Sequence, residues 1–445
     1  MADKKKTAHL GARAMGLGLR VLNRFAGAKT VDRLGLRKSS EQALYQASKL
    51  GFRTAGAVAR SFSAAQKLVR PARLSKSHSN GLFDLTPSDE QQMLREAALA
   101  FALERLRVAA SAADTACAAP AGLLKASADL GIALIGVPEA LGGAGSERSA
   151  MTNVLVAEAL AQGDMGLAVA CLAPSAVSTA LSLWGSEQQQ ATYLPAFTGD
   201  NVPAAALAIQ EPRPLFDPFV LQTRAERAGD DFVLQGVKSL VPRAAEAELF
   251  VIAAQLEDAG PALFIVESSA AGLSIEAEPA MGLRGASTGR VLLKDVKLPA
   301  TALIAGGSAE VYAECVQLGR IGWCALATGT AQAVLDYVIP YVNERVAFGE
   351  PISHRQSVAF SVANIAIELD GMRLLTWQAA SRAERGEPFA AEAALARRLC
   401  ADKGAMIGSD GVQLLGGHGF IKEHPVERWY RDLRAAGVME GVLLV

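Results

Sequence analysis

The chain has 445 residues, 51% of them hydrophobic and 20% charged, which is typical of a large globular protein and excludes a disordered or fibrous one. Its five cysteines and five histidines are dispersed, without CxxC or HExxH spacing, so they indicate a reducing compartment and neither a disulfide framework nor a metal site. The net charge of −1 is unevenly distributed, because residues 1–80 carry 17 Lys/Arg and 3 Asp/Glu whereas the rest carries 27 basic and 42 acidic residues.

Residues 1–80 therefore form a basic arm, the only part expected to attract anionic partners. Within residues 10–27, three arginines fall on one side of an amphipathic helix and four apolar residues on the other: Arg13, Arg20 and Arg24 against Met15, Leu19, Leu22 and Ala26. Three interpretations stay open: a mobile or body-packed tail, a helix lying on an anionic membrane surface, and a transit peptide. The first two place the protein in the cytoplasm, peripheral to a membrane in the second, and the third places it in the mitochondrial matrix.

The sequence also bears on nucleic-acid binding and on membrane-spanning segments. The arm's basic residues are not interleaved with stacking aromatics, so we expect no binding to nucleic acid. No apolar run is expected to approach the roughly 20 residues of a membrane-spanning helix.

Residues 84–201 are predicted to form a helical domain. Helical periodicity covers residues 86–113, 121–130, 148–162, 174–184 and 187–195. A glycine-rich turn at 136–145 interrupts these helices. It does not follow a strand and lacks G-x-G-x-x-G order, so we do not interpret it as a dinucleotide-binding loop.

Residues 202–302 are predicted to form an antiparallel β-sandwich or barrel. Short β-like runs occur at 219–223, 232–235, 250–253, 262–266 and 290–293, separated by Gly, Asp and Pro turns. Residues 303–445 return to helical periodicity, at 309–339, 356–385 and 390–415, and Pro340 is expected to kink or restart the first of these helices. The predicted fold class is therefore α+β, in the order helical domain, β domain, helical bundle.

Several motifs accompany this order of domains. They are Gly136-Val-Pro138-Glu139 with Gly142-Gly143, Trp184-Gly-Ser-Glu-Gln188, Glu211-Pro212, Gly282-Leu-Arg284-Gly285, Arg345-Val-Ala-Phe348-Gly349, Gln413 to Gly419, and Arg431-Asp432. In this order they resemble the acyl-CoA dehydrogenase family over residues 85–445. The resemblance implies FAD as cofactor, an acyl-CoA substrate oxidised to the 2-enoyl-CoA, an electron-transfer flavoprotein as acceptor, and a homodimer or homotetramer. The basic arm suggests a long-chain or very-long-chain member.

Glu440 is the predicted catalytic base. From spacing alone it is either a residue at a helix end or a carboxylate whose apolar neighbours raise its pKa toward the range useful for proton abstraction. The resemblance favours the base, because Glu440-Gly441 matches the family's Glu-Gly-Thr motif. In related members the base instead precedes an arginine that matches Arg320, but that position is Gly319 here. The resemblance assigns Arg320 and Gly441 to the substrate, although a helix arginine is more often an ion-pair partner.

Six residues are predicted to bind FAD by the same resemblance. Arg345 and Phe348 match the Arg-x-x-Phe-Gly motif, whose guanidinium fork suits the pyrophosphate. Gln413, Gly416 and Gly417 match a segment that contacts the dinucleotide from a neighbouring subunit, and Gln356 is a weaker candidate. Arg345 could alternatively form an interface salt bridge, and the two glycines could form only a turn between helices.

The β domain departs from the family pattern. Residues 210–217 replace the threonine, glycines and serine of the family's flavin loop, and Leu240-Val-Pro242-Arg243 replaces Trp-Ile-Thr-Asn. Arg213 or Arg243 could supply a substitute phosphate contact. An alternative function is a non-catalytic scaffold or acyl-CoA-binding protein of this fold, and a third is an oxidase or monooxygenase. The family continues past its glutamate with another helix, so the last domain is expected to be incomplete at Val445.

Overall fold

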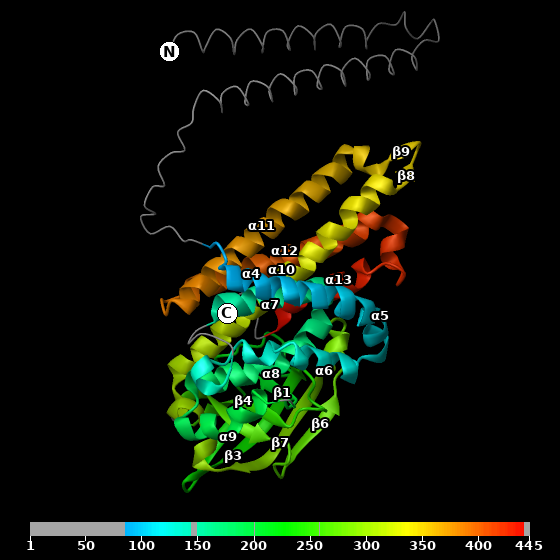
Figure 1. Ribbon diagram of the computed structural model, residues 1–445. Coiled ribbons are helices and arrows are strands. Elements are labelled where there is room, and N and C mark those ends of the chain that lie inside the picture. Colours follow the sequence, from blue (N-terminus) through cyan, green and yellow to red (C-terminus); the bar gives the residue numbers. More distant parts are fainter. Residues whose placement is uncertain (1–84, 144–148, 200, 258, 440–445) are drawn as a thin grey trace, which may run out of the picture. The chain divides into compact units, whose positions relative to one another are not determined.

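A computed structural model of the chain describes residues 85–143, 149–199, 201–257 and 259–439 (Figure 1). The basic arm, Glu440 and Gly441, about which the sequence leads to expectations, lie outside the described residues. The described chain runs through a helical region, a β-sheet and a second helical region, so the predicted α+β fold class is confirmed.

The first helical region begins with a long helix and ends before the first strand. Its elements are α4 (Asp89–Phe101), η1 (Ala102–Leu106), α5 (Arg107–Ala116), α6 (Ala121–Asp129), η2 (Ile132–Leu134), η3 (Glu139–Leu141), α7 (Ala150–Gly163), α8 (Met165–Trp184) and α9 (Glu187–Phe197). Ser88 starts α4 with a capping box, since its hydroxyl accepts from the Gln91 amide and the Gln91 side chain accepts from the Ser88 amide. The chain continues without a break from α4 through one π-helical turn, η1, into α5.

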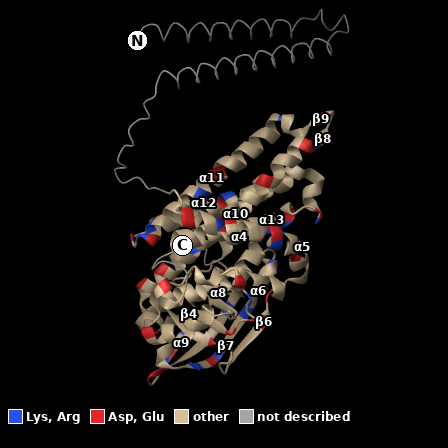
Figure 2. Ribbon diagram, viewed as in Figure 1, with Lys and Arg blue, Asp and Glu red and all other residues tan. Residues whose placement is uncertain are grey.

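Helix α8 begins nine residues before its predicted start at 174. The carboxylate of Asp164 accepts a hydrogen bond from the Leu167 amide at 2.9 Å and so caps the helix. The helix is uncharged along its 20 residues (Figure 2). It is long and apolar enough to cross a membrane, contrary to the expectation that no such run exists, but 72% of that stretch is buried within the protein. It therefore serves as a core helix.

The middle region is one seven-stranded sheet with a short branch. Its strands are β1 (Ala205–Ala208), β2 (Arg224–Ala228), β3 (Asp231–Val241), β4 (Leu249–Leu256), β5 (Gly260–Glu267), β6 (Leu273–Ala277) and β7 (Gly289–Leu298). The short turn η4 (Arg284–Ala286) lies between β6 and β7, and η5 (Ala300–Ala302) and η6 (Ile304–Gly307) follow β7. The order is β1-β4-β2-β3-β7-β6, with β5 on β4. Most pairs are antiparallel, but β4 pairs in parallel with β1 and β2. Phe232 and Phe264 meet edge to face at 5.3 Å in its core.

The strand predicted at 219–223 is wrong, because the chain forms a loop there and the strand β2 begins at Arg224. The carboxylate of Glu211 accepts hydrogen bonds at 2.8 Å from the amides of Gln222 and Thr223, so a side chain takes the donors that a sheet would use. Arg213 likewise donates to the carbonyls of Asp217 and Val220. Three strands of this sheet, β1, β2 and β6, were missing from the prediction.

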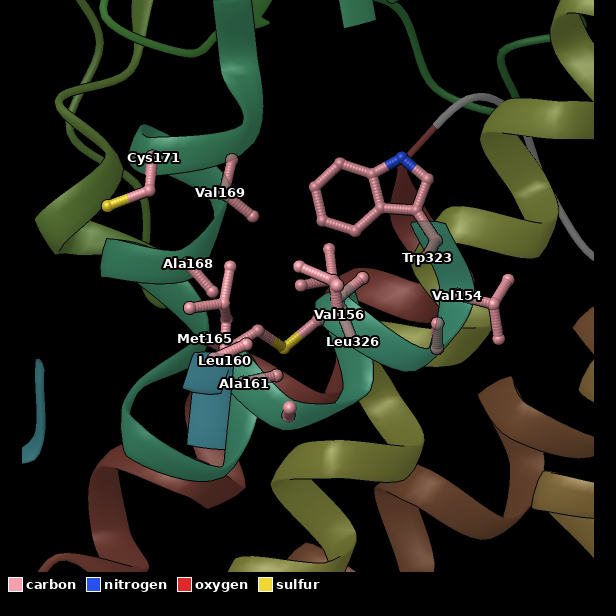
Figure 3. Packing of buried hydrophobic residues seen from close by; sticks show 14 of the residues in the cluster. Val154, Val156, Leu160, Ala161, Met165, Ala168, Val169, Cys171, Trp323 and Leu326 are labelled. Atoms are coloured by element: carbon pink, nitrogen blue, oxygen red, sulfur yellow. The ribbon is translucent and has the colours of Figure 1, made fainter. Parts of the chain in front are cut away.

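The last region is built around one long helix. Its elements are α10 (Ala309–Glu344), β8 (Val346–Ala347), β9 (Glu350–Pro351), η7 (Ile352–His354), α11 (Gln356–Glu384), α12 (Ala390–Leu415), η8 (Gly416–Phe420), α13 (Val426–Leu433) and α14 (Ala435–Val438). Helix α10 continues through Pro340, where a kink or restart was expected, and its 36 residues extend about 54 Å. It packs against α7, α8, α11 and α12 (Figure 1). Figure 3 shows Trp323 and Leu326 of this helix in one buried cluster with residues of α7 and α8.

A buried ionic junction joins the three regions at α13. Arg428 pairs with Asp164 at 2.8 Å, and Arg431 pairs with Asp114 of α5 at 2.8 Å. Asp432 accepts from the amide of Leu283, in the β-domain turn, at 2.7 Å. Burial and the neighbouring Asp164 carboxylate raise the pKa of Asp432 to about 8.

Candidate functional site

A cavity of about 280 Å³, here called the chamber, lies where α7, α8 and α10 meet β1 and β3. Its walls are mostly apolar. The side chains with polar atoms among its lining residues are Ser149, Asn153, Ser175, Thr179, Trp184, Gln210, Ser239, Cys315 and Trp323. An apolar cavity with a few polar groups is typical of a small-molecule site.

The β-domain wall of the chamber is a strained turn. Leu240, Val241 and Pro242 line the cavity, and Leu240 and Arg243 have positive φ of 52° and 50°. Glu278 holds this turn, because its carboxylate accepts from the Leu240 amide at 2.8 Å and from the Ser239 hydroxyl at 2.9 Å. Such conformations cost about 1–3 kcal/mol each and cluster at functional sites.

Arg213 and Arg243, the two candidates for a substitute phosphate contact, both bond to groups in their own loops. Arg243 pairs with Glu246 at 3.0 Å, and Arg213 donates to two carbonyls of the loop that follows it. These contacts give no support to the expected substitute phosphate contact. Apart from Gln210 and Ser239, the β-domain wall of the chamber consists of apolar side chains.

A buried ion pair lies directly behind this wall. Lys238 Nζ is 3.0 Å from Glu211 Oε1 and 3.1 Å from the carbonyl of Ile209, and both side chains are almost fully buried. Burial lowers the pKa of Lys238 to about 8, against the opposing effect of Glu211. The pair joins strand β3 to the loop after β1, and the chain neighbours Ser239 and Gln210 line the chamber.

The chain reaches the chamber again at Met439, the residue before Glu440. Met439 is buried and lines the cavity, and its carbonyl accepts a hydrogen bond from Arg397 of α12. Its amide donates to the carbonyl of Ala435 at 2.8 Å. Both backbone groups of the residue that precedes the predicted base are thus fixed at the cavity edge.

Arg320 lies beside the chamber and is not one of its lining residues. Its neighbours Gly319 and Ile321 line the cavity, whereas its guanidinium lies 5.8 Å from the ring centre of Phe219 and is buried. The substrate role of Arg320 stays a prediction.

A second depression, here called the groove, lies at the far end of α10. It measures about 1020 Å³ and is bordered by the end of α10, the β8–β9 hairpin, the start of α11 and the end of α12. It brings together five of the six predicted cofactor residues, Arg345, Phe348, Gln413, Gly416 and Gly417. Gln356 is not among the lining residues, although its neighbours Arg355 and Ser357 are.

The groove is suited to a phosphate-containing ligand. A Cβ built on Gly416 or Gly417 would meet no atom within 4 Å, so bare backbone faces open space. Arg345 forms no ion pair with any residue that the structure describes, which leaves its donor fork for a ligand and speaks against an intrachain salt bridge. These features fit the diphosphate part of FAD.

Sequence reasoning missed an aromatic cluster beside the groove. The hydroxyl of Tyr341 is 2.8 Å from Nδ1 of His418, that of Tyr337 is 2.7 Å from Nδ1 of His424, and the two imidazoles stack at 5.4 Å. His418 lines the groove. The tyrosines stand one turn apart on α10, a spacing that could have shown that they share a face, but not which residues they meet.

The chamber and the groove of one chain are far apart. Leu326 is the last residue of α10 that lines the chamber and Tyr341 is the first that lines the groove, and this separation of 15 residues along the helix corresponds to about 22 Å. The two depressions of one chain are therefore separate cavities.

Comparison with known proteins gives matches along most of the described region. Models described as acyl-CoA dehydrogenase N-terminal, middle and C-terminal domains match residues 88–200, 206–296 and 309–443. The human short-chain specific acyl-CoA dehydrogenase, mitochondrial, is 32% identical over 362 residues, covering 79% of this chain and 87% of the relative.

Two further similarities agree with these matches. The rat short/branched chain specific acyl-CoA dehydrogenase, mitochondrial, is 32% identical over 364 residues, covering 80% of this chain and 83% of the relative. The structure of butyryl-CoA dehydrogenase from Megasphaera elsdenii superposes with a TM-score of 0.75 at 27% identity, covering 81% of this chain and 97% of that one.

Proposed function

Because the chain belongs to the acyl-CoA dehydrogenase family of FAD-dependent oxidoreductases, we propose that it oxidises a short acyl-CoA thioester to the 2-enoyl-CoA, with Glu440 as the base. The observation that carries the proposal is Met439, whose buried side chain and fixed backbone bring the chain to the chamber one residue before Glu440. A short substrate is supported by the names of the two relatives, one short-chain specific and the other short/branched chain specific, against the long-chain type considered from the arm.

The proposed chemistry assigns separate tasks to the residues of the chamber. An α-proton of a thioester is weakly acidic, so a carboxylate must be positioned to take it. The apolar walls exclude water, which raises the pKa of a carboxylate and strengthens it as a base. When bound, FAD supplies a hydride acceptor for the β carbon.

The groove would hold the diphosphate part of the cofactor. Arg345 offers two parallel donors, and Gly416 and Gly417 allow phosphate oxygens to approach the backbone. Phe348, 96% exposed, offers a ring face. Residues Gln413 and Gln356 are proposed as further contacts.

We further propose that a second copy of the chain completes each site. The groove and chamber of one chain are about 22 Å apart along α10, so one groove would serve the chamber of a neighbour. Helix α11 carries an apolar stripe of Phe360, Ile367 and Leu374, 58%, 67% and 56% exposed, at heptad spacing. Such a stripe favours burial against another copy.

Glu440→Gln tests the assignment of the base. The variant should bind FAD and butyryl-CoA, because the amide is isosteric, yet fail to bleach the flavin absorbance when butyryl-CoA is added. Glu423→Gln, at an exposed carboxylate, is the matched control and should bleach normally. Bleaching by Glu440→Gln at the rate of the unaltered protein would remove Glu440 from the mechanism.

The electron acceptor is proposed to be an electron-transfer flavoprotein, as the family resemblance implies. After reduction by butyryl-CoA under anaerobic conditions, reoxidation by that flavoprotein should be much faster than by oxygen. Rapid reoxidation by air would instead indicate an oxidase.

For the arm we propose a role in location, by membrane contact or organelle import. Removing residues 1–80 should release the protein from anionic vesicles if the arm binds a membrane surface, and should abolish import into isolated mitochondria if it is a transit peptide. If removing the arm changed neither vesicle binding nor import, the interpretation as a tail without a role in location would hold.

A further inference from the structure

The last turn of the described chain is held against helix α12. Helix α14 ends at Met439, whose φ of −71° and ψ of 137° turn the chain from helical to extended. A Cβ built on Gly437 would lie 3.4 Å from the Cβ of Ala401, so α14 packs closely on one face of α12. Arg397 lies one turn before Ala401 on that face. The extended segment that begins at Met439 therefore starts beside the Arg397 side chain.

Arg397 binds the chain at this point although it is buried. It is 3% exposed, and its Nη2 atom donates a hydrogen bond to the carbonyl oxygen of Met439. Enclosing a guanidinium ion is costly unless acceptors and negative charge lie close to it. A neutral donor such as an amide would hold the same carbonyl without that cost. An arginine at this position therefore needs a reason beyond this hydrogen bond.

A second buried arginine lies near the same place. The hydrogen bond with Cys400 and burial raise the pKa of the Cys324 thiol on α10, whereas Arg397 and Arg320 act in the opposite direction, so both guanidinium groups lie near this thiol. Because its pKa is raised, the Cys324 thiol is neutral and does not balance the two cations. Helix α14, with the sequence Ala-Ala-Gly-Val, has no titratable side chain. A carboxylate close to both arginines would be strongly stabilised here.

We propose that Arg397 is the positioning residue of the base, holding the peptide that precedes Glu440 and supplying the positive charge that keeps its carboxylate ionised beside the apolar chamber. The inference rests on the proposed function and adds the residue that sets the working pH of the base. Glu440 directly follows the carbonyl that Arg397 binds. The peptide bond is planar, so holding the Met439 carbonyl also restricts the peptide nitrogen of the next residue. The apolar walls favour the neutral acid and the guanidinium favours the carboxylate.

The analogue 3-thiabutyryl-CoA allows proton removal to be measured without oxidation. Sulfur replaces its β carbon, so a base can take an α-proton and form the enolate, but no hydride can leave. The electron-rich enolate beside oxidised flavin gives a long-wavelength absorbance. That absorbance should disappear at low pH, where the free carboxylate has already bound a proton, and its midpoint reports the ionisation of the base.

Arg397→Met removes the cation and keeps an apolar stem. The midpoint should rise by at least about one pH unit, because a nearby opposite charge lowers a carboxyl pKa by about 1–3 units. Below the midpoint, bleaching of the flavin by butyryl-CoA should slow at least about tenfold. Arg397→Lys keeps the charge and should keep the midpoint. Arg398→Met, at the adjacent exposed position of α12, is the matched control and should change neither the midpoint nor the rate.

A second neutral variant guards against failure to fold. Arg397→Gln still carries a donor for the Met439 carbonyl and should raise the midpoint as Arg397→Met does. An unchanged midpoint in the neutral variants, or an equal rise in Arg397→Lys, would overturn the inference.

Glu440→Gln, measured in parallel, separates this inference from the proposed function. If it forms no enolate while the neutral Arg397 variants keep the unaltered midpoint, the base stands and only the role of Arg397 falls. Enolate formation by Glu440→Gln would remove the proposed base and this inference with it.

Discussion

Replacing Lys238 by methionine is expected to destabilise the β domain and loosen the chamber wall. The change removes the cation but keeps a side chain of similar length and apolar stem. Glu211 is then left 2% exposed and without its counter-ion, although the amides of Gln222 and Thr223 still donate to it. Breaking a buried pair in this way costs about 3–5 kcal/mol, and the two remaining donors place the expected loss near 3 kcal/mol.

Urea unfolding at pH 7, followed by circular dichroism, measures this loss. The variants Lys238→Met and Glu211→Gln and their double variant complete a thermodynamic cycle. The double variant should be more stable than the sum of the single effects predicts, by at least about 1 kcal/mol, because it leaves no unpaired charge. Retention of FAD during gel filtration reports whether Gln210 and Ser239, the chamber-lining neighbours of the pair, have moved.

The pH dependence of stability provides an independent check. The pKa of Lys238 is about 8 in the folded protein, below its ordinary value of 10.5. Between these values the unfolded chain binds more protons, so the stability of the unaltered protein should rise with pH by up to about 1.4 kcal/mol per unit from this group. Lys238→Met should lack this rise. A loss below 1 kcal/mol at pH 7, together with an unchanged pH profile, would refute the reasoning.

Two further predictions concern the domain junction and the apolar stripe. Burial raises the pKa of Asp432 to about 8, so the folded protein holds a proton that the unfolded chain releases, and stability should fall as pH rises from about 4 to 8. Thermal melts at pH 5 to 8 should therefore show a flatter profile for Asp432→Asn, and parallel profiles would contradict the assignment. Ile367→Glu should dissociate the oligomer in light scattering and weaken FAD binding, whereas Val108→Glu, at a 77% exposed position of α5, should do neither. An intact oligomer with Ile367→Glu would exclude the stripe as an interface.

The sequence patterns predicted the helices better than the sheet, for a physical reason. Helical periodicity is local, and α11 and α12 begin and end within one residue of their expected bounds. The apolar run at 219–223 has the composition of a strand, but Glu211 and Arg213, six or more residues away, capture its backbone groups. A local pattern does not show that a side chain elsewhere in the sequence will bond to the backbone groups that a sheet would use. The parallel pairing of β1 with β4 is likewise a product of the tertiary fold.

For the candidate site too, the sequence predicted the features that depend on local motifs and missed those that depend on tertiary packing. Motif spacing identified the residues that the groove brings together, because Arg345 and Phe348 sit on one tight hairpin and Gln413 to Gly417 on one helix end. The Tyr341–His418 contact depends on the packing of η8 against α10 and had no local signal. Gly322 of α10 lines the chamber, and a Cβ built on it would meet no atom within 4 Å. The sequence does not show this open space, because a glycine in a helix can equally be in contact with a neighbouring helix.

The distance between chamber and groove along α10 has a consequence for mixtures of variants. A chain with a defective groove, such as Arg345→Ala, still carries an intact chamber, and a chain with Glu440→Gln still carries an intact groove. If sites are shared between copies, coexpression of two inactive chains would restore activity at roughly a quarter of the sites, since half of randomly formed dimers are mixed and each holds one intact site. Conversely, a chain with a damaged groove would impair the site whose chamber lies on an unaltered chain of the same dimer.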